Sequence, residues 1–222
     1  MNANPDRVLL INKPLNWTSF DVVNKLRYQL NIRKIGHAGT LDPLATGLLI
    51  ICTGKLTKQI DIYQQQEKEY TGTFILGQTT PSHDLETEVS SPVPVDHLTS
   101  KQLEECRIKF TGTISQIPPL HSAIKIEGRR AYEFARKGEE RELKPREVLI
   151  SEFEWKVELP VINFKVVCSK GTYIRSLARD IGQELQVGAY LASLCRTRIG
   201  NFKLEDAKTI EEIVNEAKTM AD

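Results

Sequence analysis

The sequence predicts a mixed α+β fold, and three observations lead to it. Strand-like and helix-like patterns are interleaved along the 222 residues, without the regular alternation of a doubly wound sheet and without an internal repeat. Hydrophobic residues make up 40% of the chain and charged residues 27%, which is ordinary for a globular protein with a real core. No apolar run approaches the ~20 residues of a membrane span, and the first residues lack the pattern of a secretory signal.

The first elements are a strand over residues 8–11 and a helix that begins after Thr18, a residue suited to an N-cap. The apolar run over residues 48–52 predicts a buried strand. The later elements follow from the same signals: a helix over residues 55–63, a strand over 70–76, a helix over 98–110 starting near Thr99, strands over 148–159 and 162–168, a helix opened by Gly171-Thr172 that runs to Leu185, and a helix from Thr209 with capping-box spacing to Glu212.

Two polar segments interrupt these elements. Residues 79–94 are polar and contain three prolines, which predicts a surface loop. Residues 121–150 hold eight basic and six acidic side chains with few aliphatic ones, which is more typical of a projecting insertion than of a core element.

Charge is unevenly distributed although the net charge is only +1. Residues 1–58 carry eight basic and three acidic side chains, and residues 165–203 carry seven and two. Residues 82–105 carry one and six, and residues 204–222 carry two and six. The basic stretches favour an anionic partner at one face, but solvated surface charges would give the same pattern, and charge alone does not decide between them.

The four cysteines, Cys52, Cys106, Cys168 and Cys195, are far apart and form no Cys-x-x-Cys pair. We therefore expect reduced, buried thiols of a cytoplasmic protein rather than disulfides. The same spacing argues against a metal site.

The most informative segment is Gly36-His37-Ala38-Gly39-Thr40-Leu41-Asp42-Pro43-Leu44-Ala45-Thr46-Gly47. The residue before a proline is pushed out of helical geometry, so Asp42 must lie in a loop. Gly39 and Gly47 supply positions that tolerate unusual backbone angles, and a buried strand follows. This pattern predicts a rigid loop that presents one carboxylate, although an Asp-Pro pair can also be only a turn and a lone histidine such as His37 only a loop residue.

Arg175 lies on the helix opened by Gly171-Thr172, and none of its helical neighbours is a carboxylate. Any ion pair must therefore come from elsewhere in the fold. A pairing with Asp42 would keep that carboxylate ionised as a nucleophile, whereas an unpaired surface arginine would have no such role.

A set of aromatic and basic residues has the composition of an RNA-binding surface, since aromatic faces hold unstacked bases and cations hold phosphates. Tyrosines in strands are nevertheless most often core residues. The set consists of Tyr70, Tyr132, Tyr173, Arg129, Arg130, Lys170, Arg196 and Arg198.

Taken together, the motifs resemble those of the TruB family of tRNA pseudouridine-55 synthases of the bacterial type. The segment 36–47 resembles the catalytic loop of that family, and Asn12-Lys13-Pro14 with Thr18-Ser19 resembles its first motif. Pro118-Pro119 with Ser122-Ala123 and Lys125 is similar to the insertion that grips the T-loop. Residues 168–177 resemble the motif that carries the family arginine. The four stretches occur in the family order over residues 8–200.

The resemblance implies the pseudouridine synthase fold, a mixed and mostly antiparallel sheet flanked by helices with a central active-site cleft. It implies one catalytic domain over residues 1–222, with an RNA-gripping insertion at about 117–146, an acidic helical tail at 204–222 and no C-terminal PUA domain. The protein would then recognise mainly the T-arm of tRNA. It would act as a monomer, without a membrane, without a protein partner and without a cofactor.

The resemblance also implies a role for each matching residue. Asp42 would be the nucleophile, Arg175 its ion-pair partner, and Tyr70 would stack on the flipped uracil and assist removal of the C5 proton. The substrate-binding residues would be His37, which fills the space vacated in the T-loop, Lys13, which supports the catalytic loop with Pro14, Leu194, which lines the base pocket, and Tyr173 and Lys125, which contact the RNA. Asp42 could attack C6 or C1′, or accept a proton on a glycal route.

Two positions depart from the family pattern. Asn16 stands where the family usually has glycine, and asparagine tolerates left-handed geometry. His121 stands where many members have tyrosine. Two other functions remain open, a tRNA-binding or folding factor without catalysis and an aspartyl phosphotransferase or hydrolase, the latter disfavoured because Asp42 has no second carboxylate nearby for magnesium.

Overall fold

The structure is a computed structural model that describes residues 6–120, 125–126, 129–130 and 143–219. Contacts divide the chain into two compact units. The first unit is Met1–Thr71 with Leu194–Asp222, and the second is Gly72–Ser193. Much of the expected insertion at 117–146, including His121 and Tyr132, lies outside the described residues.

The strands confirm a mixed sheet that is mostly antiparallel. They are hydrogen-bonded in the order β1-β3-β10-β4-β9-β8-β5, with β2 pairing with β3 and β11 with β10. The pairs β1·β3, β2·β3, β10·β11, β8·β9 and β5·β8 are antiparallel, whereas β3·β10 is parallel. Their bounds are β1 Val8–Lys13, β2 Ile35–His37, β3 Ala45–Thr53, β4 Lys68–Leu76, β5 Gly112–Gln116, β8 Arg146–Glu158, β9 Val161–Cys168, β10 Ala189–Ile199 and β11 Phe202–Lys203.

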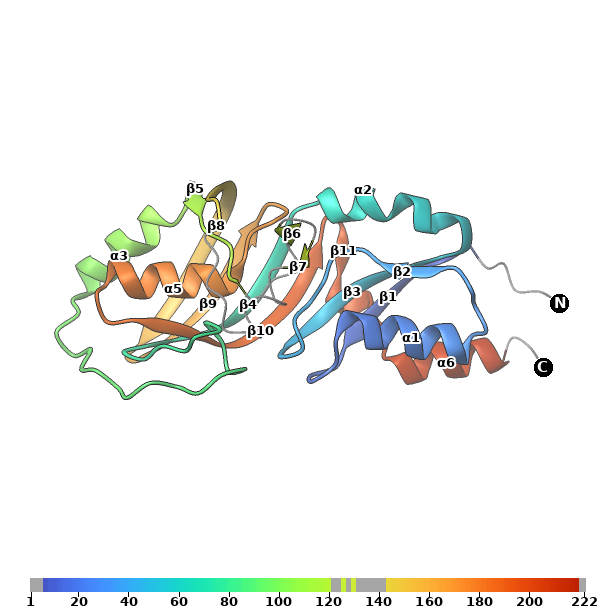
Figure 1. The fold of residues 1–222 in the computed structure, drawn as a ribbon, viewed down its shortest axis with the longest axis horizontal. Coiled ribbons are helices and arrows are strands. Elements are labelled where there is room, and N and C mark those ends of the chain that lie inside the picture. Colours follow the sequence, from blue (N-terminus) through green and yellow to red (C-terminus); the bar gives the residue numbers. More distant parts are fainter. Residues whose placement is uncertain (1–5, 121–124, 127–128, 131–142, 220–222) are drawn as a thin grey trace. The chain divides into compact units, whose positions relative to one another are not determined.

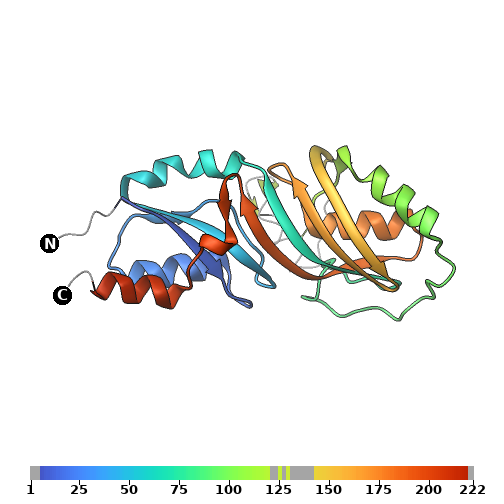
Figure 2. The same cartoon turned by 180° about the vertical axis from the view of Figure 1, so that it is seen from behind.

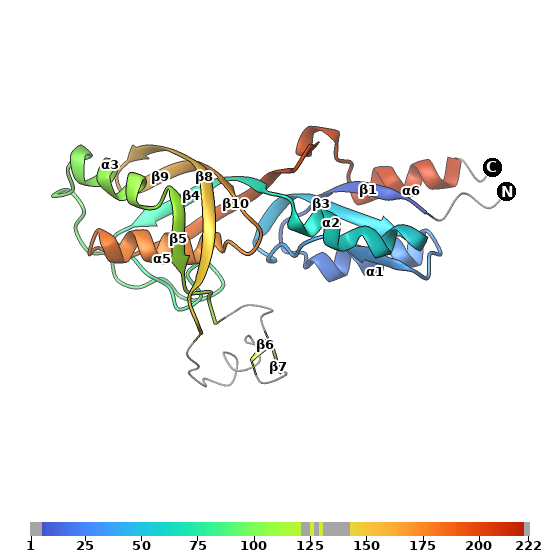
Figure 3. The same cartoon turned by 90° about the horizontal axis from the view of Figure 1, so that it is seen from above.

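In the first unit both faces of the strands are covered. Helices α1 (Ser19–Gln29) and α6 (Ile210–Thr219) cover one face, and the 3₁₀ helix η1 (Gly54–Gln59) with α2 (Ile60–Gln65) covers the other (Figures 1 and 3). Because side chains alternate along β3, Leu49 and Ile51 pack beneath α1 and α6, while Leu48 and Ile50 face η1 and α2. This double burial explains why the 48–52 run is apolar at every position.

The second unit has its helices α3 (Ser100–Lys109) and α5 (Ile174–Glu184) on one face of the strands, so that the strands lie in front when the molecule is seen from behind (Figures 1 and 2). An ion pair between Lys109 and Glu184 joins the two helices. The rings of Phe74 and Phe164 stack with centroids 4.0 Å apart in the core. Strands β6 (Lys125–Ile126) and β7 (Arg129–Arg130) pair only with each other.

Three helix starts expected from the sequence are confirmed. Thr18 and Thr99 cap α1 and α3 through capping boxes with Asp21 and Gln102. The amide of Glu212 likewise donates to Thr209 Oγ1 at the start of α6, while the Glu212 carboxylate accepts from the Thr209 amide. Among the described residues, no helix is long and apolar enough to cross a bilayer.

Several expectations needed correction. The helix expected from Gly171-Thr172 begins only at Ile174, and the buried strand expected over residues 48–52 begins already at Ala45. Strands β2, β5 and β10 were not expected. The 79–94 loop is less superficial than its composition suggested, because Thr80, Ser82 and Asp84 are buried.

Candidate active site

The loop that carries Asp42 connects β2 to β3, as its glycines and proline predicted. Gly39 and Gly47 have φ angles of +104° and +100°, which glycine adopts without strain. A side chain at Gly47 would also collide with the neighbouring strand, since a Cβ there would lie 2.4 Å from the backbone oxygen of Arg196. The backbone amide of Leu41 donates to Ser19 Oγ at 2.8 Å, which ties the loop to the start of α1. Asp42 is therefore presented from a fixed backbone.

The turn before α1 also holds this loop. Asn16 has a φ of +63°, which confirms that asparagine takes the left-handed conformation at the position where the family has glycine. Its backbone amide donates to the Pro43 carbonyl at 2.9 Å, directly after Asp42 in the sequence. The turn before α1 and the Asp42 loop are thus joined through their backbones.

Arg196 braces the loop from β10. Its side chain is 1% exposed, and its guanidinium donates to three backbone carbonyls, those of Leu48 at 2.7 Å, Thr40 at 3.4 Å and Gly39 at 3.2 Å. The sequence placed Arg196 in the RNA-binding set, which was wrong in this respect: a side chain enclosed by carbonyls cannot reach a phosphate. Arg196 is a positioning residue that the sequence pattern did not identify.

Lys13 is the second buried cation at this loop. It is 0% exposed, and Nζ donates to the carbonyls of Pro14 at 2.8 Å, Trp17 at 2.5 Å and Pro43 at 3.4 Å. Burial lowers the pKa of Lys13 to about 8, although the carboxylate of Asp42 opposes the shift, and the Arg196 cation adds to it. Lys13 thus supports the loop through these hydrogen bonds to backbone carbonyls.

The lowered pKa of Lys13 predicts how stability depends on pH. In the window between about 8 and 10.5 the unfolded chain holds a proton on Lys13 that the folded chain has lost, so the free energy of unfolding should rise with pH there. Across this pH window the free energy of unfolding of wild type should rise by up to about 3 kcal/mol relative to that of a Lys13→Met variant. Urea unfolding of both proteins at a series of pH values measures the difference, and parallel curves would contradict the prediction.

His37 ends β2 and lies close to Arg196. Its Nδ1 atom is buried, and this atom has no hydrogen-bond partner within the described part of the chain. Burial lowers the pKa of His37 below 6.5, the nearby Arg196 cation lowers it further, and a backbone hydrogen bond with Gly39 opposes the shift. The imidazole is therefore neutral at pH 7.

A neutral His37 predicts the pH profile of activity. Since burial lowers its pKa in the protein, kcat/KM should show no histidine limb with an apparent pKa at or above the ordinary value of 6.5. Comparing the profiles of wild type and His37→Gln tests this. A limb at or above pH 6.5 in wild type that disappears in His37→Gln would show that the imidazole is charged and the interpretation wrong.

Tyr70 and Leu194 lie on strands beside the loop. Tyr70 is nearly buried on β4, and Leu194 is half-buried on β10, where it pairs with Ala45 at the start of β3. Thr46 Oγ1 also donates to the Leu194 carbonyl at 3.4 Å. The first unit alone therefore gathers Lys13, His37, Asp42, Tyr70, Leu194 and Arg196 on β1, β2, β3, β4 and β10 and the loops between them.

The second unit carries Arg175 in the first turn of α5. Arg175 is 4% exposed, its Nε lies 3.5 Å from Asp84 Oδ2, and its Nη1 donates to the Ser82 carbonyl at 3.3 Å. The sequence correctly required a partner from elsewhere in the fold, but it did not identify Asp84. Asp84 itself is fixed, since its carbonyl accepts from the hydroxyls of Thr80 at 2.6 Å and Ser82 at 3.2 Å.

Tyr173 directly precedes α5, and its backbone is clamped by Gln116 at the end of β5. The Tyr173 amide donates to Gln116 Oε1 at 2.8 Å, and Gln116 Nε2 donates back to the Tyr173 carbonyl at 3.1 Å. Gln116 is 2% exposed, so both bonds are protected from water. The strand position of Lys125 is described, but its side chain is not.

The four cysteines are free thiols, three of them buried and Cys195 half-buried, as expected. Burial raises the pKa of Cys106 to about 12, so this thiol is not a nucleophile at neutral pH. Across the described residues no group of three or more His, Cys, Asp or Glu side chains is placed to hold a metal ion.

Two family models match adjoining parts of the sequence. The model for the TruB family pseudouridylate synthase (N terminal domain) matches residues 27–174, and the one for the tRNA pseudouridylate synthase B C-terminal domain matches residues 175–222.

Curated relatives match over nearly the whole chain. A tRNA pseudouridine synthase B of Parabacteroides distasonis is 57% identical over 213 residues, which cover 93% of this chain and 91% of that protein. The protein of the same name from Flavobacterium johnsoniae is 54% identical over 209 residues, covering 90% and 91%.

Solved structures give the same fold. A chain in the crystal structure of a Cbf5-Nop10-Gar1 complex superimposes with a TM-score of 0.74 and 31% identity. The match covers 97% of this chain and 55% of that chain, so this sequence spans about half its length. A structure of an H/ACA RNP bound to a substrate RNA containing 2′-deoxyuridine gives a TM-score of 0.68 and 30% identity, covering 94% and 52%.

Proposed function

The chain belongs to the TruB family of tRNA pseudouridine synthases, which are isomerases, and from this premise we propose that it converts uridine 55 in the T-loop of tRNA to pseudouridine with Asp42 as the nucleophile. The observation that carries the proposal is the fixing of the Asp42 loop by Ser19, Lys13 and Arg196. A nucleophile must be held in reacting geometry, and a backbone bonded from three elements meets that need.

The reaction exchanges one bond for another. The N1–C1′ glycosidic bond breaks, the uracil turns within the site, C5 joins C1′, and the proton on C5 is lost while N1 gains one. The carboxylate of Asp42 can begin this by attack on C6, by attack on C1′, or by taking a proton on a glycal route. Atoms and electrons balance without an oxidant or a reductant, so the reaction needs no redox cofactor.

Other residues act around this step. Uridine 55 must leave its stack first, which costs a few kcal/mol, and the neutral His37 fills the space it leaves. Tyr70 stacks on the extruded uracil and assists loss of the C5 proton, and Leu194 lines the base pocket. Arg175, held by Asp84, pairs with Asp42.

RNA contacts extend the site. Tyr173 and Lys125 bind the RNA beside the reacting nucleotide, and the insertion at 117–146 grips the T-loop. Both units act as one catalytic domain that recognises the T-arm as a monomer in the cytoplasm. The free cysteines support that reducing compartment.

The test incubates purified protein with an unmodified tRNA transcript and maps pseudouridine by chemical labelling. Product is expected at position 55 and should be absent from a transcript with cytidine at that position. If the tRNA binds but position 55 stays unmodified, the protein is a tRNA-binding or folding factor and the proposed function is wrong.

A further inference from the structure

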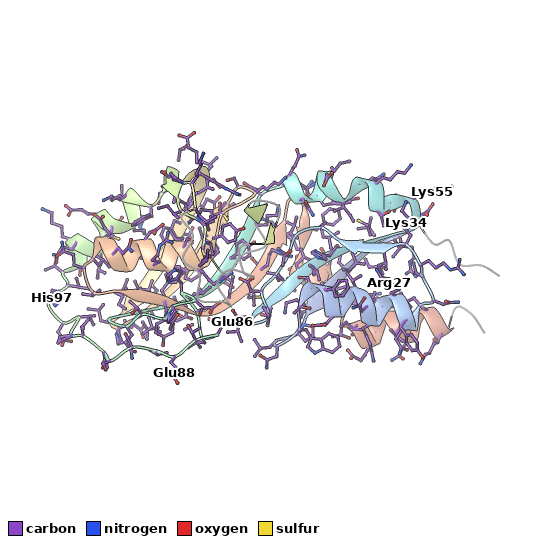
Figure 4. The ribbon with its side chains drawn as sticks, in the orientation of Figure 1. Arg27, Lys34, Lys55, Glu86, Glu88 and His97 are labelled. Carbon is purple, nitrogen blue, oxygen red and sulfur yellow. The ribbon has the colours of Figure 1, made fainter. Side chains whose placement is uncertain are left out.

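Four basic side chains gather at one end of the first unit, and we call them the basic end: Arg27, Arg33, Lys34 and Lys55. Arg27 is in the last turn of α1, Arg33 and Lys34 precede β2, and Lys55 is in η1 after β3. Figure 4 shows Arg27, Lys34 and Lys55 together at this end of the unit. Arg33, Lys34 and Lys55 are exposed and Arg27 is half-buried.

Backbone bonds hold these positions next to one another. The amide of Gly54 donates to the Lys34 carbonyl at 2.8 Å, which places Lys34 beside Lys55. The amide of Ile32 donates to the Arg27 carbonyl at 3.1 Å, which folds the segment with Arg33 back onto the end of α1. The cluster thus belongs to the fold and does not depend on side-chain rotamers.

Within the described part of the chain, the basic end is distinguished by several unpaired cations that lie side by side. Some exposed lysines elsewhere pair with carboxylates, as in Lys101–Glu105, Lys156–Glu158 and Lys203–Glu205, whereas others, such as Lys170, form no ion pair among the described residues but stand apart from one another in the sequence. Within the described residues no carboxylate pairs with any side chain of the basic end; Arg27 bonds only the neutral amide oxygen of Asn24 at 3.0 Å. The carboxylate of Asp6 accepts from the backbone amide of Lys55 at 2.6 Å.

Helix stabilisation does not explain the cluster. A cation in the last turn of α1 interacts favourably with the helix dipole, which accounts for Arg27. That effect falls off within one turn, so it gives no reason for Lys34 and Lys55. An unpaired cluster of like charges repels itself, and an anionic ligand relieves that repulsion.

The basic end is too far from Asp42 to touch the reacting nucleotide. Asp42 lies next to Ala45 at one end of β3, whereas Gly54 and Lys55 follow Thr53 at the other end. Nine residues of strand separate these ends by roughly 26 Å at about 3.3 Å per residue. An anion bound at both places must be extended, as a nucleic-acid backbone is.

From this geometry we infer that the basic end binds backbone phosphates of helical RNA beyond the T-arm hairpin, at a second surface separate from the catalytic loop. The inference rests on the proposed function, because tRNA is the RNA concerned. Phosphate contacts position an RNA without reading its sequence, so this surface sets register and affinity and leaves the chemistry to Asp42.

The experiment uses the full chain with Arg33, Lys34 and Lys55 each changed to Gln. Binding is measured against salt with two RNAs, a whole tRNA transcript and a hairpin of its T-loop and T-stem alone. Affinity for tRNA should fall roughly tenfold or more, and the slope of log K against log salt should shrink by about 2 to 3. Affinity for the hairpin and kcat at saturating tRNA should not change.

The matched control removes three charges elsewhere, with Lys101, Lys156 and Lys203 changed to Gln, and should bind tRNA as wild type does. Equal losses of tRNA affinity in both triple variants would show that only the overall charge of the protein matters, and would overturn the inference. Unchanged binding of tRNA would overturn it, and so would an equal loss with the hairpin. Failure of wild type to modify tRNA is a separate result, which counts against the proposed function alone.

Discussion

Asp42→Asn should bind tRNA with near-normal affinity and form no measurable pseudouridine. The amide has the shape of the carboxylate but neither its negative charge nor its nucleophilicity, so kcat should fall by about 10⁴-fold or more. The loop should keep its conformation, because Lys13, Arg196 and Ser19 form hydrogen bonds to its backbone that the substitution leaves in place. Single-turnover labelling at saturating enzyme separates this loss of chemistry from any loss of binding.

Two further variants make the result decisive. Asp61→Asn removes an exposed carboxylate in the first turn of α2 and should leave kcat unchanged. Asp42→Ala should be as inactive as Asp42→Asn, because both lack a carboxylate. Appreciable turnover by either Asp42 variant would remove Asp42 from the role of nucleophile.

Local features of this fold could be predicted from the sequence because local physics decides them. Thr18 and Thr99 begin helices through hydrogen bonds within four residues, and Asp42 is kept out of a helix by the proline that follows it. Gly39 takes a left-handed φ because only a residue without a side chain does so freely. Such signals lie within a few consecutive letters of the sequence.

Long-range features could not be predicted in this way. Arg196 bonds carbonyls about 150 positions away in the sequence, and Asp84 lies more than 90 positions before its partner Arg175. β10 escaped notice because its burial does not alternate, and the strand contains two arginines. A strand with neighbours on both sides takes its environment from tertiary packing, so its pattern departs from the period of two.

The two buried cations at the loop illustrate the same limit. A lysine after a strand and an arginine among polar neighbours are typical of exposed positions. Lys13 and Arg196 are buried because backbone carbonyls surround them, and carbonyl groups have no signature in the sequence. The family motif indicated that Lys13 supports the loop but gave no physical reason for it. Arg196 was wrongly expected on an RNA-binding surface.

Arg196→Met should cost both stability and turnover. The variant leaves the carbonyls of Gly39, Thr40 and the buried Leu48 without this donor, so the free energy of unfolding should fall by about 3 kcal/mol. In the fraction that stays folded, kcat should fall roughly 10²-fold, because a displacement of about 1 Å in the loop misplaces Asp42. KM should change little, since the buried guanidinium touches no RNA.

Comparison with two other variants separates positioning from simple destabilisation. Arg198→Met removes another cation of β10, which pairs with Glu67 and Glu69 and does not touch the Asp42 loop backbone, so it should lower the free energy of unfolding but leave kcat unchanged. Arg196→Lys keeps the charge but not the planar fork that reaches three carbonyls, so its kcat should lie between wild type and Arg196→Met. All three variants are measured below their unfolding transitions. If Arg196→Met then has the kcat of wild type, the loop holds Asp42 in place without the Arg196 side chain.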